Sequence, residues 1–220
     1  MYRTFFYLFL FLIVFKSGLC LGQSFVYSDK EGDKKIMLRV SKKHDQGKQM
    51  LKLESKEKVS KHVFDPGYFT LEWEIVDHVN QHDFQVRRQE NSILIKGLYK
   101  GKPLNRTVEI DDKPWINKLD HGLTEWVNSN DEELVFWTLK LNSGLDPIKF
   151  DAQKVGRERL QTSAGSFDTI KVRLSLHGFL LTKLWSAYCW YRLSDGLFIK
   201  YEGDTGPGTQ LRTIELEKIL

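Results

Sequence analysis

The segment Phe69-Thr70-Leu71-Glu72-Trp73-Glu74-Ile75 decides the fold class of this 220-residue chain, because apolar and polar residues alternate along it without interruption. Alternation with period two sends successive side chains to opposite faces of a β-strand, so that one face is buried and the other is solvated. The same pattern recurs along the chain. The further segments that follow it are 35–40, 49–55, 59–64, 82–88, 92–98, 106–110, 133–141, 170–176, 197–201 and 210–217.

Clusters of turn-forming residues separate these segments. Asp65-Pro66-Gly67, Gly101-Lys102-Pro103 and Ala164-Gly165-Ser166 each lie between two apolar runs. Asp195-Gly196 is the strongest hairpin signal among them, because a type I′ turn requires positive φ at both central residues. We therefore expect a largely antiparallel sheet of about ten strands.

One segment, residues 114–128, has the period of a helix instead. Its apolar residues recur at spacings of three and four, which places them on one stripe of a helix. They are Trp115, Ile116, Leu119, Leu123, Trp126 and Val127. Such a stripe must be buried against another element. The predicted fold is mainly β: a curved antiparallel sheet, or half-barrel, wrapped around one main helix.

The ends and the middle of this helix also carry signals. Asp111 or Asp112 is expected to be the N-cap, and Pro114 is expected in the first turn. Gly122 lies within the helix and costs about 1 kcal/mol relative to Ala. We therefore expect the helix to bend or to split near Gly122.

The N-terminal region predicts export. Arg3 precedes an 11-residue apolar run, residues 5–15 (FFYLFLFLIVF), and Lys16 ends it. This run has the length of a signal-peptide core and is too short to cross a bilayer, which takes ~20 residues. Cleavage is expected after Gly22, with cleavage after Cys20 or lipid modification of Cys20 as alternatives. The domain prediction is a signal peptide at 1–22, a single half-barrel domain at 23–220, and no transmembrane segment after cleavage.

Charge argues against nucleic acid as a partner. The chain has 33 Lys and Arg against 29 Asp and Glu, and removing residues 1–22 takes away Arg3 and Lys16 but no acid, which leaves a net charge of +2. Basic residues alternate with acids instead of forming a basic face, as nucleic acid binding would require. Cleavage after Gly22 also leaves Cys189 as the only cysteine, which is expected to be buried and inert.

Catalytic and metal-binding patterns are weak. His78 and His82 are spaced by four residues, but they lie in the link between two predicted strands and not on a helix. No nucleophile elbow, phosphate-binding loop or dinucleotide-binding loop is found. We predict no catalytic residues, no metal site and no cofactor, and therefore no enzyme, although hydrolase activity stays open.

The second half of the chain carries a family resemblance. Residues 156–172 (GRERLQTSAGSFDTIKV) resemble the G-x-E-x-x-x-T-x-x-G-x-F-x-x-x-K-V signature of a large family of exported bacterial proteins of unknown function. The resemblance implies a half-barrel similar to the outer-membrane lipoprotein carriers, and a periplasmic location in bacteria with two membranes. The residues themselves predict a hairpin turning at Gly165, with Glu158 and Lys171 on paired strands as an opposite-charge contact.

Tryptophan is the residue type that suggests a function. A sheet curled around a helix would bring most of the six tryptophans to one interior, either as a filled core or around an apolar pocket. The function predicted is non-catalytic binding of an apolar or lipid-like ligand between helix and sheet. The alternatives are a structural or protein-partner module with a filled core and, third, a glycan-acting envelope enzyme. The candidate ligand-binding residues are Trp73, Trp126, Trp137, Trp185 and Trp190.

Overall fold

The computed structural model describes residues 22–45, 47–178, 180–204 and 210–220. The predicted signal peptide at 1–22 lies almost wholly outside them. Within this part of the chain there are fourteen β-strands, two short α-helices and two 3-10 helices, η1 and η2. Their bounds are β1 Gln23–Glu31, β2 Lys34–Asp45, β3 Lys48–Glu54, β4 Lys58–Phe64, β5 Thr70–Asp77, β6 His82–Gln89, β7 Ser92–Tyr99, β8 Lys102–Glu109, α1 Leu119–Gly122, α2 Thr124–Asn128, β9 Glu133–Lys140, η1 Leu141–Ser143, β10 Asp146–Thr162, β11 Gly165–Leu176, η2 Leu181–Lys183, β12 Ser186–Arg192, β13 Phe198–Asp204 and β14 Leu211–Ile219.

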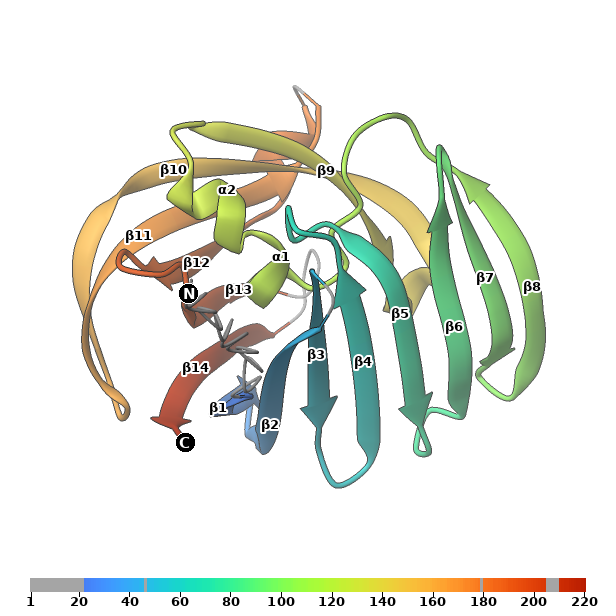
Figure 1. The fold of residues 1–220 in the computed structure, drawn as a ribbon, viewed down its shortest axis with the longest axis horizontal. Helices are drawn as coiled ribbons and strands as arrows, with labels where there is room; N and C mark the ends of the chain where they lie inside the picture. The colour runs from blue at the N-terminus through green and yellow to red at the C-terminus, as the bar shows by residue number, and fades with distance from the viewer. Residues whose placement is uncertain (1–21, 46, 179, 205–209) are drawn as a thin grey trace, which may run out of the picture.

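All fourteen strands form one antiparallel sheet, so the mainly-β, antiparallel prediction is confirmed but the number of about ten strands is wrong. The strand order is β8-β7-β6-β5-β4-β3-β2-β1-β14-β13-β12-β11-β10-β9. Two meanders, β1 to β8 and β9 to β14, are joined where β1 pairs with β14. Figure 1 shows them as two curved groups of strands with both α-helices between them.

The two outer strands of this open sheet, β8 and β9, are brought together by side chains and loops. Arg106 on β8 donates from Nη2 to the carbonyl of Leu145 at 2.5 Å and pairs with Asp146 at 3.2 Å. The hydroxyl of Tyr99 on β7 donates to the carbonyl of Leu141 at 2.6 Å. The inner face of β5 to β8 therefore packs against β9 and the turn that follows it, in one apolar cluster.

The helix predicted at 114–128 is split, as expected from Gly122, and it begins later than predicted. Residues 119–122 form α1 and residues 124–128 form α2, with Leu123 between them. A Cβ at Gly122 would lie 2.4 Å from the side chain of Ile116, so the chain passes too close there for any other residue. Leu123 and Trp126 belong to the main apolar cluster, which confirms that the stripe is buried against the sheet.

The segment before α1 is extended and not helical, which corrects the placement of Trp115 and of the N-cap. The amide of Trp137 on β9 donates to the carbonyl of Pro114, and the amide of Ile116 donates to the carbonyl of Trp137, both at 2.8 Å. Trp115 therefore forms a parallel bridge to Trp137. The N-cap position is Lys118, because pairing with β9 holds the preceding residues out of the helix.

Two hairpins were predicted from their turns. The hairpin at Asp195-Gly196 is confirmed between β12 and β13, but the type I′ turn is wrong, because Gly196 has φ of +66° while Asp195 is not among the residues with positive φ. Asp195 instead pairs with Arg192 at 2.6 Å and accepts the Leu197 amide at 3.2 Å. The hairpin at Gly165 joins β10 and β11, where φ of Gly165 is +133°.

Candidate functional site

A cavity of about 390 Å³ lies between the start of α1 and the strands of the second meander. We call it the apolar chamber. Its walls come from the six strands β9 to β14 and from the segment 117–120. It is lined by Asn117, Lys118, Leu119, Asp120, Thr138, Leu139, Lys140, Leu141, Ile148, Phe150, Leu176, Trp185, Cys189, Phe198, Tyr201, Asp204, Arg212 and Ile214.

A second cavity, of about 290 Å³, adjoins the first on the side of the first meander. We call it the charged chamber. Five lining residues are common to both chambers: Asn117, Lys118, Leu139, Leu141 and Arg212. The remaining lining residues are Asp29, Ile36, Leu38, Leu53, Glu54, Ser55, Lys58, Ser60, His62 and Trp73.

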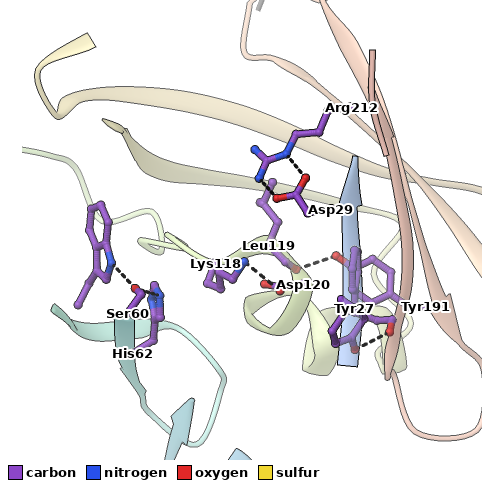
Figure 2. A network of polar contacts seen from close by, with 11 residues as sticks. Tyr27, Asp29, Ser60, His62, Lys118, Leu119, Asp120, Tyr191 and Arg212 are labelled. Carbon is purple, nitrogen blue, oxygen red and sulfur yellow. Dashed lines mark hydrogen bonds and ion pairs between the residues drawn. The ribbon is translucent and has the colours of Figure 1, made fainter. Parts of the chain in front are cut away.

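The segment between the chambers is held in place by hydrogen bonds. The amide of Asn117 donates to Thr70 Oγ1 at 3.0 Å, and its side-chain Oδ1 accepts the Leu139 amide at 3.2 Å. The carbonyl of Leu119, in the first turn of α1, accepts the hydroxyl of Tyr191 at 2.7 Å (Figure 2). These bonds fix the segment 117–120 across the interior, so it forms a wall of both chambers.

Aromatic side chains line one end of the apolar chamber. Phe150 packs edge-on against Trp185, with ring centroids 5.2 Å apart, and stacks on Phe136 at 5.9 Å. Trp185 Nε1 donates to the carbonyl of Asp204 at 2.9 Å, which satisfies the indole with a backbone group. This end of the chamber is therefore an aromatic, apolar surface of the kind that suits an apolar ligand.

Two ion pairs, both drawn in Figure 2, lie at the charged chamber: both members of the first line it, whereas in the second only the cation does, and its acid, Asp120, lines the apolar chamber. Arg212 on β14 binds Asp29 on β1 with two hydrogen bonds of 2.8 and 2.5 Å, and Lys118 pairs with Asp120 at 3.0 Å. The bonds to Asp29 raise the pKa of Arg212. In each pair the acid is nearly inaccessible, at 8% and 9% exposure, whereas the cations are exposed to 35% and 23%.

Two neutral histidines lie beside this charged group. His62 Nε2 is 2.9 Å from Ser60 Oγ, which also accepts Trp73 Nε1–H at 2.9 Å (Figure 2). Burial lowers the pKa of His62 well below its ordinary value and lowers that of His121 to about 4, so both imidazoles are neutral at pH 7. Within the described residues, His62 Nδ1, His121 Nε2 and Asp120 Oδ1 are buried without a hydrogen-bond partner.

The chemistry available here is that of binding. Cys189 lines the apolar chamber, but burial raises the pKa of its thiol, which keeps it protonated and unreactive. No group of three or more His, Cys, Asp or Glu that could hold a metal ion is found in the described part of the chain. His82 Nδ1 accepts the Lys100 amide at 3.1 Å, and its ring stacks on Tyr99, so this histidine is part of the packing.

The five tryptophans predicted to bind ligand are not brought together. Trp185 lines the apolar chamber and Trp73 lines the charged chamber. Trp126 packs in the main apolar cluster, with Lys154 over its ring. Trp137 donates to Asp111 at 2.6 Å and Trp190 donates to Glu158, and neither lines a chamber described above.

Glu158 and Lys171 occupy paired strands as predicted, with the ion pair at 3.8 Å. Sequence reasoning did not single out Phe150, Ile214, Lys118 or Arg212 as site residues. Alternation on 210–217 did predict one buried face for Ile214, but it could not indicate that this face borders a cavity.

Comparisons with known proteins give only distant likenesses. No family model and no curated protein matches the chain. Among solved structures, the hypothetical lipoprotein YmcC from Escherichia coli is 11% identical, with a TM-score of 0.47 over 89% of this chain and 84% of that one. A protein from Bacteroides fragilis, described as exported with a YmcC-like fold, is 10% identical, with a TM-score of 0.35 over 90% and 95%. A LolA superfamily protein from Nitrosomonas europaea is 7% identical, with a TM-score of 0.26 over 90% and 84%.

The family resemblance of residues 156–172 stays a prediction after these comparisons. As to membranes, the described residues contain no helix that is both long enough and apolar enough to span one.

Proposed function

We propose that this chain is an exported, non-catalytic protein that binds an apolar or lipid-like ligand in the apolar chamber. The observation that carries the proposal is the chamber itself: an open cavity of about 390 Å³ between α1 and the sheet, lined mostly by leucine, isoleucine and aromatic side chains, with a few charged residues among them. Ligand pockets commonly measure roughly 300–1,000 Å³ and are mostly apolar, with a few polar groups that orient the ligand.

The chamber suits a single acyl chain. Moving apolar groups from water into an apolar pocket stabilises the complex by about 0.8 kcal/mol for each buried CH₂. Leu119, Leu139 and Ile148 supply aliphatic surface along the walls, and Phe150 and Trp185 supply the aromatic end. A chain-shaped ligand would gain from this surface along its whole length.

The N-terminal region supports an exported location for such a protein. Arg3, the apolar run at 5–15 and Lys16 have the order of a signal peptide. In a bacterium with two membranes the location would be the periplasm, where lipid-like molecules must cross an aqueous space. The resemblance of residues 156–172 to exported proteins similar to lipoprotein carriers agrees with this location.

The direct test is a titration of delipidated protein with a fluorescent fatty-acid analogue while tryptophan emission is followed. Saturable binding at micromolar concentration is expected, with Trp185 responding because it lines the chamber. Leu176→Phe, which narrows the apolar chamber, should weaken binding. Leu98→Phe on the exposed side of β7 is the matched control and should leave it unchanged. Absence of saturable binding would exclude this function.

A protein-partner module is the second candidate, and one specific observation favours it. Leu180, Leu181 and Leu184, around η2, are 72%, 45% and 63% exposed and lie close together in sequence. Neighbouring apolar side chains on a surface are typical of interaction sites. Replacing Leu180 and Leu184 by Ser should then abolish binding of a partner purified from the same envelope while leaving the fatty-acid titration intact.

A glycan-acting enzyme has the least support. Such enzymes use two carboxyl groups that converge on one cleft. The nearly inaccessible carboxylates of the cavity, Asp29 and Asp120, are each bound to a cation instead.

A further inference from the structure

Each chamber is lined by three cations and two acids, but the charged chamber has fewer apolar lining residues. In the two ion pairs shown in Figure 2, the cation is more exposed than the acid. The side chain of Lys118 is 23% exposed against 9% for Asp120, and that of Arg212 is 35% exposed against 8% for Asp29. Each acid is thus covered by protein, while its cation still reaches open space. Arg212 uses Nε and Nη2 for Asp29, which leaves further N–H donors, and an ammonium group such as that of Lys118 has three.

A third cation, Lys58 on β4, lines the charged chamber without an ion-pair partner among the described residues. The charged groups that act on it are Lys118, Asp77, Arg212 and Asp29. Burial, followed by the charge of Lys118, lowers the pKa of Lys58, and Asp77 only partly offsets this. A second lining acid, Glu54, pairs with Lys52 at 2.6 Å. The chamber therefore has an excess of positive charge.

This excess lies directly beside the apolar chamber. Asn117, Lys118 and Arg212 line both spaces, so a molecule whose chain fills the apolar chamber would have its end next to these donors. Asp120, which lines the apolar chamber, and His62, which lines the charged chamber, each have a buried side-chain atom without a hydrogen-bond partner, Oδ1 and Nδ1 respectively.

We propose that the ligand of the cavity is an amphiphile with an anionic headgroup, a phosphate or a carboxylate, which binds between Lys58, Lys118 and Arg212 while its chain occupies the apolar chamber. This inference rests on the proposed function and adds the chemical class of the headgroup. Cationic side chains with spare donors form charge-assisted hydrogen bonds with such oxygens. A neutral headgroup would leave Lys58 without a counter-charge in a partly buried position.

The test compares amphiphiles that share one chain and differ only in the headgroup. Dodecyl phosphate, dodecanol and dodecyltrimethylammonium are titrated below their critical micelle concentrations into delipidated protein in a calorimeter. Dodecyl phosphate should bind about tenfold or more tightly than dodecanol, the size of effect expected for a hydrogen bond between charged groups. The trimethylammonium compound should bind more weakly than dodecanol.

Variants at Lys58 test whether the tighter binding of dodecyl phosphate than of dodecanol arises in the charged chamber. Lys58→Gln should remove most of the difference between dodecyl phosphate and dodecanol, while Lys58→Arg should keep it. Lys58 is chosen because its removal leaves no described acid without its partner. Lys61→Gln on the same strand is the matched control, since Lys61 is exposed and paired with Glu74 on the outer face. It should leave the preference unchanged.

Each contrary result has a distinct meaning. Equal affinity for dodecyl phosphate and dodecanol would overturn the headgroup inference and leave the proposed function standing. If inorganic phosphate alone bound as tightly as dodecyl phosphate, the site would be one for a free anion and the inference would be wrong. Failure of all three amphiphiles to bind would overturn both proposals. These comparisons use the unmodified chain, so they do not depend on whether a variant folds.

Discussion

Strands β6 and β10 belong to the same sheet but bury their side chains differently. On β6, Phe84 and Val86 are buried, and the residues beside them, 83, 85 and 87, are exposed. On β10, residues 147–151 are all half-buried. The first pattern is that of a strand against a filled core, and the second is that of a strand beside open space. Neither chamber has a lining residue from β6, β7 or β8.

The two burial patterns distinguish a filled part of the interior of the sheet from a hollow part. Around β6 and β7 the interior is filled by Phe84, Val86, Ile93 and Ile95. Around β10 and β13 the side chains reach the interior but do not fill it, so a ligand-sized volume is left. Because apolar side chains face inward in both regions, the presence of an apolar face does not say which region is hollow.

The largest expected effect comes from truncating one phenylalanine in each region. Phe84→Ala should lower the free energy of unfolding by about 3–5 kcal/mol, because it leaves a void in a packed core. Phe150→Ala should cost roughly 1–2 kcal/mol, because its side chain already borders empty space. Chemical denaturation of both variants measures the difference. Equal losses would mean that the apolar chamber is packed as tightly as the core around β6.

The buried histidines His62 and His121 should make the free energy of unfolding depend on pH. His121 is buried, with its pKa lowered to about 4, while in the unfolded chain it titrates near 6.5. Below pH 6.5 the unfolded state therefore binds a proton that the folded state does not. The free energy of unfolding should fall by up to about 3 kcal/mol between pH 6.5 and 4, and His62 acts in the same direction. His121→Leu should flatten this dependence. An unchanged slope in that variant would contradict the assignment.

Two glycines with nearly equal φ provide a finer comparison. Gly97 on β7 has φ of +135°, and a Cβ there would lie 2.2 Å from the Asp83 carbonyl oxygen. Gly165 has φ of +133°, and its nearest neighbour would be the ring of Phe167 at 3.7 Å. Backbone strain of this kind costs about 1–3 kcal/mol. Gly97→Ala should therefore reach or exceed the upper end of that range and Gly165→Ala should stay near its lower end, as thermal unfolding can measure.

The smallest expected effect is on the outer face, where the two regions should behave alike. Lys61 pairs with Glu74 in the first meander at 3.4 Å, and Lys171 pairs with Glu158 in the second at 3.8 Å. Both pairs are largely solvated, so a double-mutant cycle should give less than about 1 kcal/mol for each. A large coupling energy for only one of the two ion pairs would mean that the two regions differ on the outer face of the sheet as well as in the interior.

The strands were predictable where burial follows period two. Phe69 to Ile75 gave β5 because Trp73 and Ile75 are buried and Glu72 and Glu74 between and beside them are not, although Thr70 at the start of the strand is buried. β1 was missed because Ser28 and Asp29 are buried with Tyr27, so the polar residues interrupt the pattern instead of alternating with it. The helix period at Trp115 was overridden by a partner distant in sequence, Trp137, which pairs with Trp115 in an isolated parallel bridge.

The cavity itself could not be predicted from the chain. Of the five candidate tryptophans, Trp73 and Trp185 line a chamber, but nothing local in the sequence distinguishes a residue that lines a space from one that fills it. The cation Arg212 was invisible as a site residue because Asp29, the acid that orients it, is 183 positions away.

The single ladder between β1 and β14 has a consequence for folding. Every other ladder of the sheet joins strands that follow one another in sequence, so each meander can form through short loops. Closing β1 onto β14 spans nearly the whole described chain, and such long-range contacts form slowly because loop closure costs entropy before any contact compensates for it. We therefore expect this ladder to form late. The charged chamber takes Asp29 from β1 and Arg212 from β14. The binding site would then be completed only in the last step of folding, and an incompletely folded chain would not yet hold a ligand there.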